Sequence, residues 1–121
     1  MLNALCLFSF YLFLACHSAS DSNLSYAQAL FEQGRLATEQ QLYQQALELF
    51  QSAREKSPKV THLTHFESGN IYALLGQTDL ASQEYELALK ADPHHNESRH
   101  NLAVLRADQG RLPEAVAILE H

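Results

Sequence analysis

The chain has 121 residues, of which 46% are hydrophobic and 18% charged, with only four glycines and three prolines. This composition excludes collagen-like, linker-like and disordered chains. Fourteen acidic against eight basic residues leave a net charge of −6. The basic residues form no run, so the sequence predicts no nucleic-acid partner. The length suits one small domain or a few repeats of a smaller unit.

The first sixteen residues, MLNALCLFSFYLFLAC, are apolar and carry no charge. They are fewer than the roughly twenty residues of a membrane-spanning helix, but they match the apolar core of a secretory signal. We therefore predict that residues 1–16 are a signal segment outside the folded domain. Both cysteines, Cys6 and Cys16, fall within it, so no disulfide or thiolate metal site is expected downstream.

The end of this segment, Phe13-Leu14-Ala15-Cys16, resembles the lipobox of bacterial lipoproteins. That resemblance implies lipidation of Cys16 and a lipid-anchored protein in the cell envelope, at the periplasmic face of the outer membrane. Two alternatives remain open, an ordinary signal cleaved after residues 18–20 and an uncleaved N-terminal anchor. All three imply export. Residues 17–26 are mostly small and polar, and predict a flexible tether followed by the start of a helix.

The remaining chain repeats with a period of 34 to 35 residues. Gly34, Ala46, Phe50, Ala53 and Pro58 match Gly69, Ala81, Tyr85, Ala88 and Pro93 at an offset of 35. At an offset of 34, Gly76, Ala81 and Tyr85 match Gly110, Ala115 and Leu119. A period in this range is typical of stacked helical repeats.

Within each unit the spacing indicates two helices. Ala81, Tyr85 and Ala88 lie at i, i+4 and i+7, which is one stripe of an α-helix. A small residue such as Gly69 on the preceding helix permits close contact between the two. Gly76 and Gly110 are expected in the loops between helices, where a left-handed residue ends the first helix.

The pattern Gly69-x2-Tyr72, Ala81-x3-Tyr85-x2-Ala88-x4-Pro93 resembles the tetratricopeptide repeat. The resemblance implies an all-α fold in which helical hairpins stack as a short right-handed α-solenoid. The three units would be residues 27–60, 62–95 and 96–121, the third of them truncated. The fold itself is compatible with many unrelated binding functions.

In such repeats the first helix of each unit lines a concave face. By register, the lining here would include Phe31, Arg35, Leu63, Phe66, Asn70, His100 and Val104. Some members of the family clamp a peptide carboxylate with lysines or arginines and asparagines. Phe31, Phe66 and His100 replace those lysines, so we predict an apolar groove for an extended or amphipathic segment instead. In the alternative interpretation, Phe31 and Phe66 pack between neighbouring units.

Seven histidines include His62 and His65 on one helix and His94, His95 and His100 at the next junction. Their spacing matches no known set of metal ligands, and surface histidines are the expected interpretation. No phosphate-binding loop or nucleophile motif is present, so no enzyme and no cofactor are predicted.

We therefore expect a protein-interaction adaptor at an envelope membrane, with another protein as its partner. Two alternatives remain: a ligand-, metal- or pH-sensing module that uses the histidines, and an N-terminal fragment of a larger repeat protein.

Overall fold

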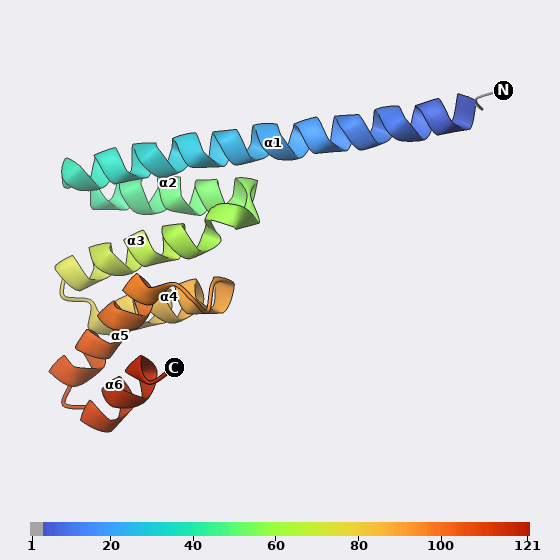
Figure 1. Cartoon of the computed structure of the whole chain (residues 1–121). Helices are drawn as coiled ribbons and strands as arrows, with labels where there is room; N and C mark the ends of the chain where they lie inside the picture. The colour runs from blue at the N-terminus through green and yellow to red at the C-terminus, as the bar shows by residue number, and fades with distance from the viewer. Residues whose placement is uncertain (1–3) are drawn as a thin grey trace.

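The computed structural model describes the backbone of residues 4–121 and the side-chain surroundings of residues 7–121. The first three residues of the predicted signal segment lie outside that range. The described chain is helical throughout, with short connections (Figure 1). Its elements are α1 (Ala4–Glu39), α2 (Tyr43–Lys56), the 3-10 helix η1 (Pro58–Val60), α3 (Thr61–Leu74), α4 (Thr78–Ala91), α5 (Asn96–Asp108) and α6 (Leu112–Leu119).

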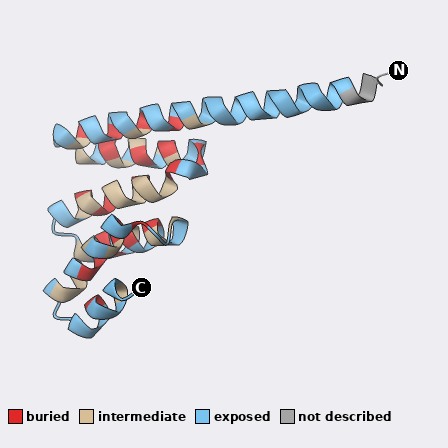
Figure 2. Ribbon diagram, in the orientation of Figure 1, coloured by how far each residue is buried: buried red, intermediate tan, exposed pale blue. Residues whose placement is uncertain are grey.

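The helices pack as three hairpins, α1 with α2, α3 with α4, and α5 with α6. Figure 1 shows the hairpins stacked one on the next, with α2 against α3 and α4 against α5. The predicted all-α fold of stacked helical hairpins is therefore confirmed. The N-terminal part of α1 projects well beyond the stack, and Figure 2 shows this part exposed along its length.

Glycine and aromatic residues set the distance between the helices of a hairpin. A Cβ atom on Gly69 would lie 2.6 Å from Cε1 of Tyr85, and one on Gly34 would lie 2.6 Å from Cε1 of Phe50. Phe50 is fully buried and Tyr85 is 2% exposed. Each ring therefore occupies the space that a side chain on the facing glycine would need, which explains why glycine is tolerated inside these helices.

The turns between paired helices share one backbone conformation. Gly76 and Gly110 have φ angles of 74° and 75°, so the expectation of left-handed glycines at these positions is confirmed. In the first hairpin the corresponding residue is Gln41, with a φ angle of 62°. A side chain in this region of φ raises the free energy, because Cβ crowds the following carbonyl.

Residues 17–26 differ from the prediction of a flexible tether, because they form part of α1. The chain has no glycine or proline before Gly34, so nothing in the segment breaks a helix. The hydroxyls of Ser18, Ser20 and Ser22 each donate a hydrogen bond to the carbonyl three residues earlier, at 2.8–3.0 Å. Serine is thus accommodated within the helix rather than ending it.

The apolar stretch near the N-terminus lies on the projecting part of α1. Its large side chains from Leu7 to Leu14 are each about half exposed or more. No helix in the part of the chain that the structure describes has the length and hydropathy needed to cross a membrane.

Candidate functional site: the pocket between α3, α4 and α5

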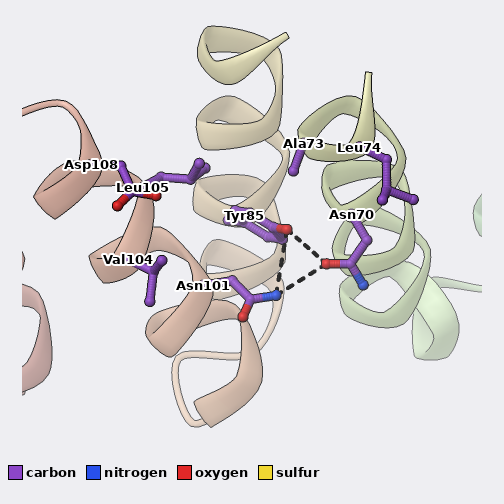
Figure 3. A pocket seen from close by; sticks show the side chains of 8 residues that line it. All are labelled: Asn70, Ala73, Leu74, Tyr85, Asn101, Val104, Leu105 and Asp108. Carbon is purple, nitrogen blue, oxygen red and sulfur yellow. Dashed lines mark hydrogen bonds between the residues drawn. The ribbon is translucent and has the colours of Figure 1, made fainter. Parts of the chain in front are cut away.

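A pocket of about 540 Å³ opens between the second and third hairpins. We call it the central pocket. It is lined by two asparagines and a tyrosine, by four apolar side chains and by one carboxylate (Figure 3): Asn70, Asn101, Tyr85, Ala73, Leu74, Val104, Leu105 and Asp108.

Each element contributes for a local reason. Asn70 follows Gly69 on α3, so the close approach of α3 and α4 brings its amide to the edge of the Tyr85 ring. The Tyr85 ring is buried between the helices, and its hydroxyl lies toward Asn70 and Asn101 (Figure 3). Asn101 lies one turn into α5 and completes the group from the third hairpin. The polar group therefore depends on the stacking of two hairpins.

The three polar side chains form one hydrogen-bond network (Figure 3). The Tyr85 hydroxyl donates to Oδ1 of Asn70 at 2.7 Å, and Nδ2 of Asn101 donates to the same oxygen at 3.0 Å. Nδ2 of Asn101 also lies 3.4 Å from the Tyr85 hydroxyl. In Figure 3, Oδ1 of Asn101 carries no hydrogen bond to the other residues drawn.

Apolar surface flanks this network. Leu74 is 69% exposed on α3 and Val104 is 44% exposed on α5. Exposed aliphatic side chains beside an amide pair can contact the side chains of an extended segment while the amides pair with its backbone.

The electrostatic surroundings are acidic. Burial raises the pKa of the Glu67 carboxyl, and the Arg35 guanidinium and a hydrogen bond from Asn70 partly offset that rise. Burial also raises the pKa of the Tyr85 hydroxyl, which the hydrogen bond with Asn101 partly offsets, so this group is neutral at physiological pH. Arg35 itself forms an exposed ion pair with Glu32 at 3.4 Å.

The residues predicted for the groove do not all lie together. Asn70 and Val104 line the central pocket, whereas Arg35 is exposed on α1 and Leu63 is partly buried on α3. His100 is exposed and lies over the α5–α6 hairpin, in a second pocket that includes Val104.

The two predicted groove aromatics are half-buried and pack inward. The Phe31 ring centroid lies 5.6 Å from that of Phe50, and the Phe66 centroid lies 6.1 Å from that of Tyr85 and 5.1 Å from that of His95. Both rings therefore contribute to packing within and between hairpins. This arrangement agrees with the alternative interpretation, in which Phe31 and Phe66 pack between neighbouring units and do not line a groove.

Two polar members of the central pocket, Tyr85 and Asn101, are not among the residues predicted from the sequence. The sequence places Tyr85 only on a helical stripe, although a phenol at a position that is phenylalanine in the first hairpin indicates a polar partner. Asn101 aligns by the repeat with Glu67 and Glu32, so a polar position recurring in all three units was the available signal.

His62, His65 and His95 each contact other side chains of the helical stack. His65 Nδ1 contacts Oε2 of Glu84 at 2.6 Å, and His95 Nδ1 contacts the Ser98 hydroxyl at 2.8 Å at the start of α5. The His62 ring lies edge-on to His95, with centroids 5.3 Å apart. Among residues 7–121 there is no group of three or more histidine, cysteine or carboxylate side chains placed to hold a metal ion.

Comparison with known proteins agrees with the repeat pattern. A family model described as tetratricopeptide repeat matches residues 17–60 and 66–120. Tetratricopeptide repeat protein 8 of Mus musculus is 35% identical over 77 residues, which are 64% of this chain and 14% of that protein. This chain therefore spans only a small part of the length of that relative.

Solved structures share the fold at low sequence identity. The crystal structure of MamA superposes with a TM-score of 0.70 at 21% identity, covering 78% of this chain and 54% of the other. The second TPR domain of Spaghetti (RPAP3), bound to the HSP90 peptide SRMEEVD, superposes with a TM-score of 0.72 at 16% identity. That match covers 85% of this chain and 94% of the other.

Proposed function

Because the chain belongs to the tetratricopeptide repeat family, we propose that it is a protein-interaction module that binds an extended peptide segment in the central pocket. The observation that carries the proposal is the Asn70–Tyr85–Asn101 network beside exposed Leu74 and Val104. Within the network Oδ1 of Asn70 accepts and Nδ2 of Asn101 donates, so Nδ2 of Asn70 and Oδ1 of Asn101 are the atoms left to pair with the C=O and the N–H of a peptide backbone. Binding rather than catalysis is the role that this surface supports.

The peptide is proposed to be neutral or basic. Asp108 lines the central pocket and the carboxyl of Glu67 is hydrogen-bonded to Asn70, while Arg35, the cation that acts on Glu67, is paired with Glu32. An acidic segment would meet like charge, which disfavours association. The Spaghetti domain, by contrast, is bound to an acidic peptide.

Selection and affinity measurement test this proposal. Peptides of about ten residues are selected from a displayed random library against the full chain, and their Kd is measured by fluorescence polarisation. We expect lysine- or arginine-containing peptides whose Kd rises at least about tenfold in the double variant Asn70→Ala, Asn101→Ala, because paired polar contacts are lost. Gln83→Ala, on the exposed side of α4, is the matched control and should bind normally. Acidic consensus peptides, or an unchanged Kd in the double variant, would reject the site.

We also propose that the chain is exported and anchored at an envelope membrane through a lipid on Cys16. Cys16 is an exposed free thiol on the projecting part of α1, after the exposed apolar side chains of Leu7 to Leu14. A helix that is apolar on all sides is more stable when it is buried in lipid or protein than when it is exposed to water.

Metabolic labelling tests the anchor. With a radiolabelled fatty acid in a bacterial host, the wild-type chain and a Cys6→Ser control should be labelled, and Cys16→Ser should lose at least nine-tenths of the signal. Equal labelling of Cys16→Ser and wild type, or no label on any of the three, would eliminate a lipid on this cysteine.

A further inference from the structure

The exposed face of α1 aligns, through the repeat, with the face of α3 that packs on the preceding hairpin. Ala29, Gln33 and Leu36 align with Thr64, Ser68 and Ile71 at the offset of 35 residues. On α3 those three residues are at most 1% exposed, and Ile71 packs against Ala46 and Phe50 of the first hairpin. On α1 all three are exposed, and Leu36 is 55% exposed. We call Ala29, Gln33 and Leu36 the head face.

The α5–α6 hairpin has the complementary surface. A pocket of about 260 Å³ lies on it, lined almost entirely by apolar atoms: His100, Ala103, Val104, Ala107, Leu112, Ala115, Val116 and Leu119. We call this the tail groove. Ala115 and Leu119 align with Ala81 and Tyr85, and with Ala46 and Phe50 before them.

In the first two hairpins the equivalents of the tail groove are covered by the next helix. Ile71 of α3 covers Ala46 and Phe50, and Leu102 of α5 packs against Ala81 and Tyr85. In the third hairpin no described residue covers the groove, and Leu119 is 57% exposed. The surfaces equivalent to the tail groove are thus covered by α3 in the first hairpin and by α5 in the second. Both helices use the positions that align with the head face.

Both surfaces are also free of the charges that would oppose their burial. The head face has no ionisable side chain, and His100 is the only titratable residue of the tail groove. Two of the neighbouring carboxylates, Glu32 beside the head face and Glu114 beside the groove, are each paired with an arginine, Arg35 and Arg111. Docking the two faces thus buries apolar surface without stranding a charge.

We propose that copies of this chain associate head to tail, with the head face of one copy seated in the tail groove of the next. The occupant of the groove is then a second copy of α1, placed as α3 is placed on the first hairpin. Such a contact joins two different surfaces and leaves one of each free at the ends. The assembly therefore grows with concentration rather than closing as a dimer.

Sedimentation velocity of the full chain tests the inference, over roughly a hundredfold range of protein concentration. The wild-type mass average should rise steadily without a plateau at the dimer. Leu36→Glu and Leu119→Glu each place a charge at the contact, and each should weaken association at least about tenfold. Leu87→Glu is the matched control, because Leu87 is an exposed leucine on α4 that lies outside both faces. It should behave as wild type.

Mixing the two variants gives the sharpest result. Leu36→Glu retains an intact tail groove and Leu119→Glu retains an intact head face, so an equimolar mixture should form a dimer that cannot grow. A wild-type chain that stays monomeric would overturn the proposal and would leave the groove to another occupant, such as a further helix of a longer chain. Association that persists in both single variants would also overturn it and would point to the apolar Leu7–Leu14 stretch. A mixture that fails to dimerise would be equally decisive against it.

Discussion

Replacing Gly69 with alanine tests how closely α3 and α4 pack. The new Cβ would lie 2.6 Å from Cε1 and 2.8 Å from Cδ1 of Tyr85, so the ring must retreat by about 0.8 Å to reach the 3.4 Å of ordinary contact. The ring is 2% exposed and its hydroxyl is hydrogen-bonded to Asn70, which leaves it little room to move. Overpacking of this kind costs about 1–3 kcal/mol.

Two opposing terms set the net effect of Gly69→Ala. Alanine stabilises a helix by roughly 0.5–1 kcal/mol relative to glycine, so we expect a net loss of about 1–2 kcal/mol in the free energy of unfolding. For a domain of this size the melting temperature should fall by about 5–15 °C, measured by circular dichroism.

The chain itself supplies the control for this prediction. In the third hairpin the equivalent positions hold Ala103 and Leu119, an alanine facing a leucine instead of a glycine facing a ring. In a Tyr85→Leu background, Gly69→Ala should therefore cost nothing or stabilise by up to about 1 kcal/mol. An equal loss in both backgrounds would refute the steric explanation of the glycine.

Three further substitutions test separate features. Gln41→Gly should stabilise the chain by about 1 kcal/mol in thermal denaturation, because Gln41 has a φ of 62° that glycine adopts without strain. Phe66→Ala should lower the free energy of unfolding by about 2–3 kcal/mol, because the half-buried ring packs on Tyr85 and His95. This loss is smaller than that for a fully buried ring, and an unchanged melting temperature would indicate that the ring is not structural. Glu67→Gln should stabilise the chain at pH 7, since burial raises the pKa of the Glu67 carboxyl and its ionisation then opposes folding. The gain in stability should vanish as the pH falls below the ordinary pKa range of a glutamate. A gain that persists in acid would contradict this cause.

The hairpin stack could be predicted from the sequence because its steric requirements recur at a fixed offset. Gly34 faces Phe50, and Gly69 faces Tyr85 at an offset of 35 residues. In both pairs a small residue is needed where an aromatic ring of the next helix approaches. Gly76 likewise marks its turn, since only a left-handed residue ends that helix. Close helix contacts and turns that recur in every hairpin can therefore be predicted from the repeating residue types.

The continuity of α1 was not predictable from polarity. The serine-rich residues 17–26 have the composition of a tether, but helix formation depends on the absence of glycine and proline and on hydroxyls that bond within the helix. Composition reports the solvent exposure of such a segment, which is high here, and not its backbone conformation.

The candidate site was predictable only in part. Asn70 and Val104 follow from the register, because both lie on a helix face that the repeat defines. The direction of the Phe66 ring depends on His95, which belongs to the next connection, and the role of the Tyr85 hydroxyl depends on Asn101 from another hairpin. Such contacts between units are set by the stacking geometry, which no single repeat contains.

Nuclear magnetic resonance can locate a bound peptide relative to the point where Asn70 and Asn101 meet. The ¹⁵N-labelled full chain is titrated with a peptide selected for binding. If the peptide binds in the central pocket, the largest shift changes belong to the side-chain amides of Asn70 and Asn101 and to the backbone of Leu74 and Val104. Gln83, on the exposed side of α4, should be unaffected. Changes that are largest at Gln83, with the two asparagine side chains unmoved, would contradict it.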